Sequence, residues 1–495
     1  MFRFKNLFTA ATKAEWIERI HTLTNWTSDD ATALPHTAIA SGDASVTVNG
    51  TIITWDGSTN NDWGTATNWT PATIPGSGTN VTIPSGLTNY PTVTGVVSVN
   101  TVTINSGATL LTKDATSFTG SVTYQRNLAT TNWYLVSSPV NGEIMTDMRV
   151  NNSFVTNGSS EISFAPYDNS QAVAADRWSY FSNAATDPLV NGKGYSTKLS
   201  ATGNLSFTGT VNTSNSGVPI TLTQGTGSGG NNYNAIGNPY TSYINSGTFL
   251  TEEGITTSDI TSATLWLWNQ SLGGGTGQYE TKVAGNSFKI APGQGFFVEA
   301  NSTNAVTFTE AMQSHETTDT FQRNEAKPEI HLFINDGSDS RFLKVYYINE
   351  MTKGFDNGYD GELFGGVSHP FAIYSHLLED NQGKKYQIQS LPDSDYESMI
   401  IPIGVNATAG KEITFSSETL NLPNGIKVYL EDRLTNTITR LNEANSEYKI
   451  TLKESLDGIG RFYLHTTTSS VLNIDSEFLN SVSIFNTSNN SLKIT

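Results

Sequence analysis

Residues 232–250 read NYNAIGNPYTSYINSGTFL, and residues 265–300 read LWLWNQSLGGGTGQYETKVAGNSFKIAPGQGFFVEA. These two stretches are the most informative about the fold. A Gly-Asn-Pro-Tyr turn, an aromatic strand and a Gly-Gln-Gly-Phe-Phe strand follow one another, with no helical spacing of apolar residues between them. Short strands bounded by Gly, Asn and Pro are typical of antiparallel sheets. The pattern predicts an all-β protein.

The composition is polar but sparsely charged. Charged residues make up 15% of the 495 residues and aromatic residues 10%, and the aromatic content argues against disorder. This combination is typical of extracellular β proteins. The net charge of −18 argues against a nucleic-acid partner, because phosphate binding needs clustered Lys and Arg. The absence of Cys excludes disulfides and Cys-ligated metals.

The sequence carries no evident membrane or export segment. No run of about 18 apolar residues occurs, so we expect no membrane-spanning helix. Charged residues interrupt any apolar core of a signal peptide near the start, and residues 5–23 suit a short amphipathic helix instead. Because the composition is extracellular in type, we expect a fragment of a longer protein that works outside the cell or on its surface.

The first part of the chain divides into two regions. Residues 1–43 are expected to form a leader or linker that includes the short amphipathic helix. Residues 44–122 are rich in Trp and then read VVSVNTVTINSGATLLT over 96–112, with short β-branched runs broken by a Gly corner. Such runs predict the rungs of a short β-solenoid-like segment. Two or three rungs are too few to be stable alone, so this segment should pack on its neighbour.

Two antiparallel β-sandwich domains are predicted after it. The first covers 123–325 and contains the GNPY and GQGFF motifs. The second covers 326–469, where charged residues become more frequent and seven or more short strands follow one another. Its opening, IHLFINDGSDSRFLKVYYI, predicts two strands joined at Asp336-Gly337.

Several stretches resemble modules of secreted and cell-surface proteins of the Bacteroidetes that carry a C-terminal type IX secretion sorting domain. They are YQRNLATTNWYLVSSPV at 124–140, the GNPY and GQGFF strands, and KVYLED, YKITL and RFYLH within 427–465. The last residues, SVSIFNTSNNSLKIT, resemble the first strands of the sorting domain, so 470–495 is expected to be its truncated start. The resemblance implies an adhesin-like surface protein with the type IX secretion machinery as a partner.

Two acidic clusters are candidates for Ca²⁺, the one cofactor that we expect could be bound. Asp356, Asn357 and Asp360 lie in the Gly-rich segment FDNGYDGELFGG, where carboxylates and carbonyls can converge on a hard cation. Asp56 and Asp62 lie at positions 1 and 7 of a run with oxygen side chains at every second residue. The alternative for both clusters is turn chemistry, since Asp, Asn and Gly dominate turns without any metal.

Trp266 and Trp268 are the candidate ligand-binding residues. They are two positions apart, so they share one face of a strand. If exposed, they could stack on sugar rings, and if buried they belong to the core.

The function predicted from these features is non-catalytic. No H-E-x-x-H motif and no G-x-S-x-G elbow is present, and no set of catalytic residues is predicted. We therefore expect an adhesin or a stalk-type scaffold exported by type IX secretion, with glycans or other copies of surface proteins as partners. The alternatives are a carbohydrate-binding accessory part of a polysaccharide-active enzyme, and a subunit that self-assembles into a filament through strand edges.

Overall fold

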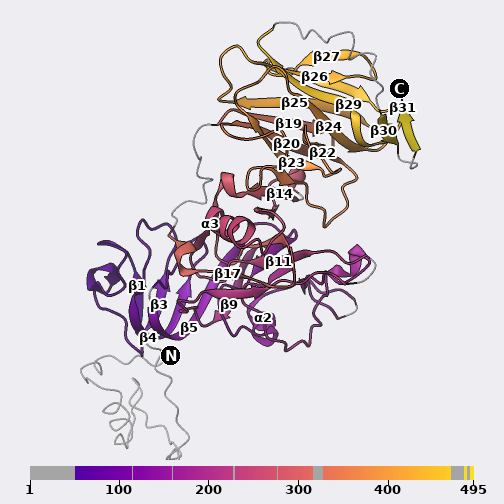
Figure 1. Cartoon of the computed structure of the whole chain (residues 1–495). Helices are drawn as coiled ribbons and strands as arrows, with labels where there is room; N and C mark the ends of the chain where they lie inside the picture. The colour runs from indigo at the N-terminus through magenta and orange to yellow at the C-terminus, as the bar shows by residue number, and fades with distance from the viewer. Residues whose placement is uncertain are drawn as a thin grey trace, which may run out of the picture. The chain divides into compact units, whose positions relative to one another are not determined.

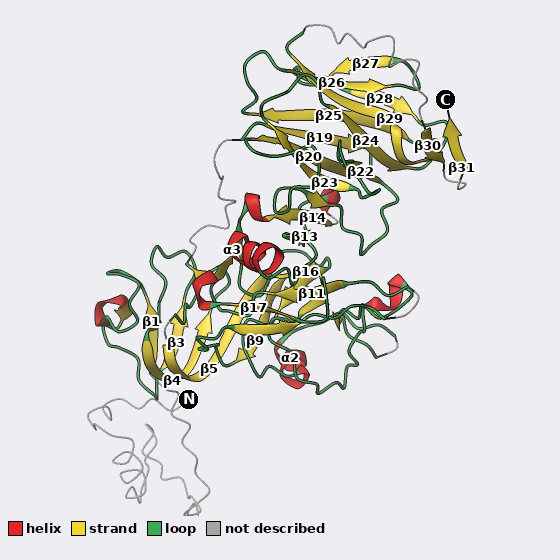
Figure 2. Cartoon of the chain, viewed as in Figure 1, coloured by secondary structure: helices red, strands yellow, loops and turns green. Residues whose placement is uncertain are grey.

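The computed structural model describes residues 51–113, 115–158, 160–226, 229–275, 277–315, 327–469, 484–487 and 491–494. The prediction of an all-β protein is confirmed, because strands dominate the described chain and its helices are short (Figures 1 and 2). The helix expected near the N-terminus and the rest of 1–43 lie outside the described residues, as does most of 470–495. Within the described ranges no helix has the length and apolarity needed to cross a membrane.

The helical elements are brief. Among the described residues the α-helices are α2 (Met145–Asn151) and α3 (Ser246–Thr251), and α3 continues into a π-helical turn, η3 (Glu252–Thr256). Asn245 caps α3, since its side chain accepts a hydrogen bond from the Thr248 backbone N–H at 3.1 Å. The 3₁₀ turns are η1 (Ala66–Asn68), η2 (Ala174–Arg177), η4 (Gly273–Gly275), η5 (Ala284–Asn286) and η6 (Glu310–Met312).

A six-stranded sheet begins the described chain. Strands β1, β3, β4 and β5 pair in parallel, and a second line of parallel bridges joins Asp62, Thr92 and Leu111. Successive segments of the chain therefore pair in parallel in two places, along the sheet and along this second series of bridges. The solenoid interpretation of this region stays a prediction. The sheet has the order β2-β1-β3-β4-β5-β9, with β1 (Ile52–Trp55), β2 (Trp69–Thr70), β3 (Asn80–Ile83), β4 (Gly95–Ile104), β5 (Ala115–Leu128) and β9 (Gly203–Gly209).

The Trp-rich region packs on the residues that follow it. Its three indoles, Trp55, Trp63 and Trp69, are buried, and the ring of Trp69 lies 4.8 Å and 4.7 Å from the other two. They share one apolar core with residues of β5 and β9. The boundary expected between residues 122 and 123 falls inside β5, so one continuous strand links the two regions.

Four smaller sheets form the region that carries the GNPY and GQGFF motifs. The GNPY turn is held by Asn238, whose amide donates to the carbonyls of Ser242 and Ile290 and whose Oδ1 accepts from the Tyr240 N–H. The sheets are β11-β16-β13-β14 (Tyr233–Gly237, Gly295–Glu299, Thr264–Asn269, Gln278–Val283), β6-β8-β7 (Tyr134–Ser137, Gly194–Thr197, Phe164–Pro166), β15-β12-β18 (Lys289–Ile290, Tyr243–Asn245, Gln313–Ser314) and β10-β17 (Val218–Thr221, Ala305–Phe308).

The described strands from residue 329 onward form one sheet that rolls over its own core. Phe415 of β25 (Glu412–Leu420) and Phe462 of β29 (Leu456–Thr467) face each other across this core, with ring centroids 4.7 Å apart. The hairpin predicted at Asp336-Gly337 is confirmed, because β19 and β20 pair from Glu329–Tyr346 to Asn335–Ser340.

The rolled sheet follows the path β27-β26-β29-β24-β22-β23-β20-β19-β25-β28, with β21, β30 and β31 attached beside it. Its strands are β19 (Glu329–Asn335), β20 (Ser340–Ile348), β21 (Gly361–Glu362), β22 (Ala372–Ser375), β23 (Tyr386–Pro392), β24 (Ile400–Ala407), β25 (Glu412–Leu420), β26 (Lys427–Asp432), β27 (Thr437–Arg440), β28 (Tyr448–Thr451), β29 (Leu456–Thr467), β30 (Ile484–Thr487) and β31 (Ser491–Ile494).

Candidate binding site

The hairpin of β13 and β14 positions both candidate tryptophans. Trp266 pairs with Thr281 and Trp268 with Tyr279, so the two indoles lie on one face of the hairpin. That face belongs to an aromatic cluster, which we define as Tyr233, Trp266, Trp268, Tyr279, Phe297 and Phe364, and Tyr167, Trp178, Leu135 and Ala235 pack around it. The hairpin register therefore brings the two indoles into one cluster, as the two-residue spacing predicted.

Trp266 is a core residue of this cluster. Its side chain is 2% exposed, its ring lies 5.3 Å from Phe364, and its indole N–H donates to the Glu362 carbonyl at 2.9 Å. Both the apolar surface and the polar atom of the indole are satisfied within the protein. Of the two alternatives that the sequence left open, Trp266 takes the buried one.

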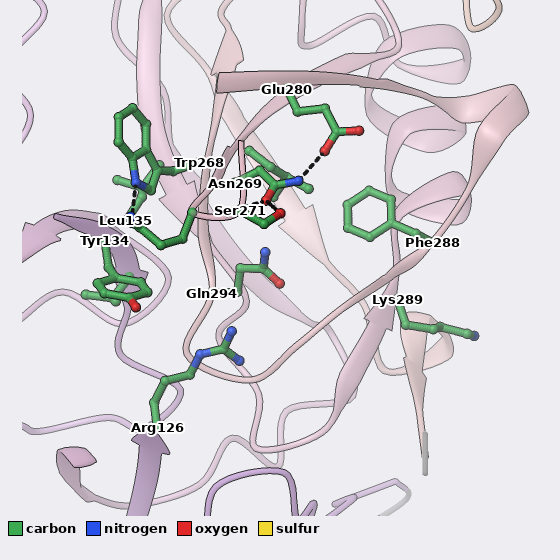
Figure 3. Close-up of a pocket in the computed structure, with 13 residues that line it drawn as sticks. Arg126, Tyr134, Leu135, Trp268, Asn269, Ser271, Glu280, Phe288, Lys289 and Gln294 are labelled. Atoms are coloured by element: carbon green, nitrogen blue, oxygen red, sulfur yellow. Dashed lines mark hydrogen bonds between the residues drawn. The ribbon is translucent and has the colours of Figure 1, made fainter. Parts of the chain in front are cut away.

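Trp268 has a different environment. It is partly exposed, its ring meets Tyr279 edge-on at 4.9 Å, and its Nε1 donates to Gln270 Oε1 at 3.2 Å. It lines a cavity of about 440 Å³, the Trp268 cavity, shown in Figure 3. The other lining residues are Arg126, Tyr134, Leu135, Val136, Leu267, Asn269, Gln270, Ser271, Glu280, Phe288, Lys289 and Gln294.

A glycine sets the position of the Trp268 ring. Gly277 has a φ of +91°, and a Cβ atom there would lie 2.5 Å from the indole ring carbons. A larger residue would have to displace the ring, and its side chain would also make the left-handed backbone conformation unfavourable. The close approach of the Gly277 backbone supports one side of the indole and leaves the ring at the cavity wall.

The cavity wall combines aromatic rings with amide and hydroxyl groups. Gln294 Oε1 accepts from the Ala291 N–H at 3.1 Å, which turns its NH₂ group toward the cavity (Figure 3). Ser271 donates to Asn269 Oδ1 at 2.6 Å, and the Asn269 amide donates to Glu280 at 2.9 Å. Apolar ring faces beside a few fixed polar groups are the usual composition of a small-molecule or saccharide site.

The carboxylate in this wall is already paired. Glu280 lies 2.5 Å from Lys282 Nζ, and both side chains are buried. Burial raises the pKa of Glu280, but the ammonium group of Lys282 more than offsets this and holds the pKa below its usual value. Glu280 is therefore an anion whose charge is balanced inside the protein, and it leaves the cavity without a net negative charge of its own.

The residues proposed for Ca²⁺ in the Gly-rich segment hold the backbone together. Both oxygens of Asp360, which is fully buried, accept backbone N–H groups: Asp356 at 2.7 Å and Ser390 at 2.6 Å. Burial raises the pKa of Asp360 to about 7. Asp356 accepts from the backbone and hydroxyl of Thr352, and Asn357 bonds backbone groups of the preceding region. These contacts are those of turn and junction residues.

The second acidic run shows turn chemistry as well. Asp56 accepts from the Ser58 N–H at 3.0 Å and from the Thr70 hydroxyl, and Asp62 accepts from the Gly64 N–H at 3.0 Å and the Thr65 hydroxyl. Over the ranges that the structure describes, no group of three or more His, Cys, Asp or Glu side chains is placed to hold a metal ion. Binding of Ca²⁺ at either cluster stays a prediction.

The sequence reasoning missed Arg126 and Gln294 as cavity residues. Arg126 lies two residues before the end of β5, a strand whose alternate residues are apolar, and Gln294 belongs to the GQGFF motif. The strict alternation in VTYQRNL at 122–128 was the signal that could have found Arg126, because it places the cation on the core-facing side.

Comparison with known proteins gives one match. No curated protein and no solved structure matches the chain significantly. The model of one family, described as a domain of unknown function (DUF8693), matches residues 102–465. This range covers well over half of the chain, and it includes the Trp268 cavity, the aromatic cluster and most of the rolled sheet. The chain belongs to the DUF8693 family.

Proposed function

We propose that this protein is a non-catalytic, adhesin-type surface protein, exported by type IX secretion, that binds glycans in the Trp268 cavity. Sugar rings carry apolar C–H faces and many hydroxyls, so they are bound by aromatic rings next to amide and hydroxyl groups. The observation that carries the proposal is the arrangement of Trp268, Gln294 and Ser271 around a single cavity of about 440 Å³.

The order of the cavity wall supports binding without rearrangement. Gly277 supports the Trp268 ring, and the Gln294 amide is oriented by Ala291. Preorganised groups lose little conformational entropy on binding, which favours even weak ligands. Many copies on one surface would turn weak single contacts into firm attachment.

A glycan array followed by titration calorimetry tests the proposal. We expect the protein to bind at least one glycan class without turning it over, and Trp268→Ala to weaken binding about tenfold or more, since a loss of about 1.4 kcal/mol of apolar contact is a tenfold change in affinity. Trp133→Ala is the matched control, because Trp133 is an exposed indole that does not line the cavity. Binding that survives Trp268→Ala, or no binding to any glycan, would reject the proposal.

A stalk-type scaffold is the second candidate, and the junction between the two β regions favours it. Phe364 from the rolled-sheet region completes the aromatic cluster of the preceding region, with its ring 4.5 Å from Tyr279 and 4.9 Å from Phe297. A junction that buries aromatic side chains resists bending more than a polar linker does. Small-angle scattering that yields one fixed envelope, unchanged by added glycan, would support this role.

A further inference from the structure

Arg126 occupies a position that the strand pattern reserves for apolar residues. In β5 the side chains of Val122, Tyr124 and Leu128 are 0%, 1% and 1% exposed, and Arg126 lies in the same alternating series. The pairing of β5 with β9 is regular from Val122 to Leu128, so no bulge turns Arg126 to the other face. A cation is therefore directed to the core-facing side, where it lines the Trp268 cavity (Figure 3).

The guanidinium group has little to satisfy it within the protein. Its one hydrogen bond given by the structure runs from Nη1 to the Pro292 carbonyl at 3.3 Å. None of the ion pairs among the described residues includes Arg126, and none includes Lys289 at the cavity rim. Placing a charge beside a core without a counter-charge costs free energy, so structure alone gives no reason for an Arg here.

The net charge of the whole protein makes an unpaired cation at this cavity a stronger indication of an anionic ligand. The chain has a net charge of −18, which repels anions in general. The charges around the Trp268 cavity differ from this acidic average. The carboxylate in its wall, Glu280, is paired with Lys282, whereas Arg126 has no carboxylate partner among the described residues. A locally cationic cavity in a strongly acidic protein selects for a ligand that carries a negative group at one defined place.

We propose that the Trp268 cavity binds an acidic saccharide, with Arg126 holding its carboxylate or sulfate group. The planar guanidinium matches two oxygens of either anion, and such charge-assisted hydrogen bonds are stronger than neutral ones. The Gln294 amide, on the same side of the cavity, donates to a neighbouring hydroxyl, and the sugar ring lies against Trp268. The Lys289 ammonium group extends away from the other lining side chains in Figure 3, so it adds positive potential at the rim.

This inference rests on the proposed glycan-binding function and names its ligand class. The test compares three probes by calorimetry: an unsulfated oligogalacturonate, a sulfated galactan without uronate, and a neutral cello-oligosaccharide. We expect one or both acidic probes to bind, more weakly as salt is raised, and the neutral probe to bind at least tenfold more weakly. The difference between the first two probes tells which anion Arg126 holds.

Arg126→Met is the decisive variant. Met has a similar length and suits the apolar side of β5, so the variant should keep or exceed the wild-type melting temperature while its affinity for the acidic probe falls about 10- to 100-fold. Lys453→Met is the control, because it removes the same charge at an exposed position far along the chain. A purely structural Arg126 would give the opposite result, a lower melting temperature with unchanged binding.

The outcomes separate the two proposals. Acidic and neutral probes that bind equally, with Arg126→Met at wild-type affinity and Trp268→Ala impaired, would overturn the anion inference and leave glycan binding in place. No binding to any of the three probes would overturn the anion inference, and a glycan array on which nothing binds would reject both proposals. Arg126→Met and Lys453→Met could also weaken binding of the acidic probe to the same extent. The loss would then come from the change in net charge, and the inference would be overturned.

Discussion

Asn357 Oδ1 accepts a hydrogen bond from the backbone N–H of Ala263 at 2.8 Å, across 94 positions of sequence. The amide of the same side chain donates to the Gly254 carbonyl at 2.9 Å. One carboxamide thus satisfies a donor and an acceptor of the region that ends at β18. The Gly-rich segment that suggested a metal site works here as a connector between two β regions.

Replacing Asn357 should loosen this connection. Asn357→Ala leaves one N–H and one carbonyl without their partner, and we expect the free energy of unfolding to fall by about 1–3 kcal/mol. Urea denaturation followed by Trp fluorescence measures the change. Asn204→Ala is the control, since Asn204 is exposed and bonds only other polar side chains. Equal midpoints for both variants would contradict the role assigned to Asn357.

Cutting the chain between residues 322 and 330 should not separate the two halves. We expect the fragments to co-elute in gel filtration under native conditions, because Phe364 packs among the aromatic rings of the other fragment and Trp266 donates to Glu362. Phe364→Ala should release them, since removal of a buried aromatic ring costs about 3–5 kcal/mol. Fragments of the unaltered protein that elute apart would show that the junction is weak.

Asp360→Ala should destabilise the protein to the same extent in Ca²⁺ and in chelator. The substitution removes the acceptor of two backbone N–H groups, so we expect a loss of about 3 kcal/mol that does not depend on metal. Melting curves in both conditions measure it, with the exposed Asp393→Ala as control. A rise in melting temperature with Ca²⁺ that disappears in Asp360→Ala would instead support the calcium prediction.

His315 should make part of the stability pH-dependent. Its ring nitrogens lie 2.8 Å from Thr92 Oγ1 and 2.9 Å from Thr109 Oγ1, and burial lowers its pKa to about 4. Between about pH 6.5 and 4 the unfolded chain takes up a proton that the folded chain does not. The contribution is therefore complete above pH 6.5 and is lost as the pH falls, by on the order of 3 kcal/mol.

His315→Gln isolates this effect. We expect the free energy of unfolding of the wild type, relative to the variant, to decline as the pH is lowered from 7 to 4, because Gln cannot titrate in this range. Urea titrations at several pH values give both curves. Parallel curves over the whole range would mean that His315 titrates normally in the folded protein.

The strands were predictable from the sequence, whereas the site was only partly so. Period-two alternation and Asp336-Gly337 predicted β19 and β20, because hairpin register depends on neighbouring residues. The spacing of Trp266 and Trp268 could not tell which indole is buried, because the covering ring, Phe364, comes from about 100 residues later. The same limit applied to Asp360, because its partner Ser390 lies 30 residues later, in β23.

The aromatic cluster also sets an order of events during synthesis. Trp266, Tyr279 and Phe297 all leave the ribosome before Phe364, which contacts each of them. Until that residue emerges, the growing chain carries an uncovered aromatic face next to the developing cavity. Premature termination before Phe364 would leave this face permanently open, and apolar surface of that kind is where nascent chains associate with one another. The family match, over residues 102–465, includes Phe364 together with the three rings that it covers.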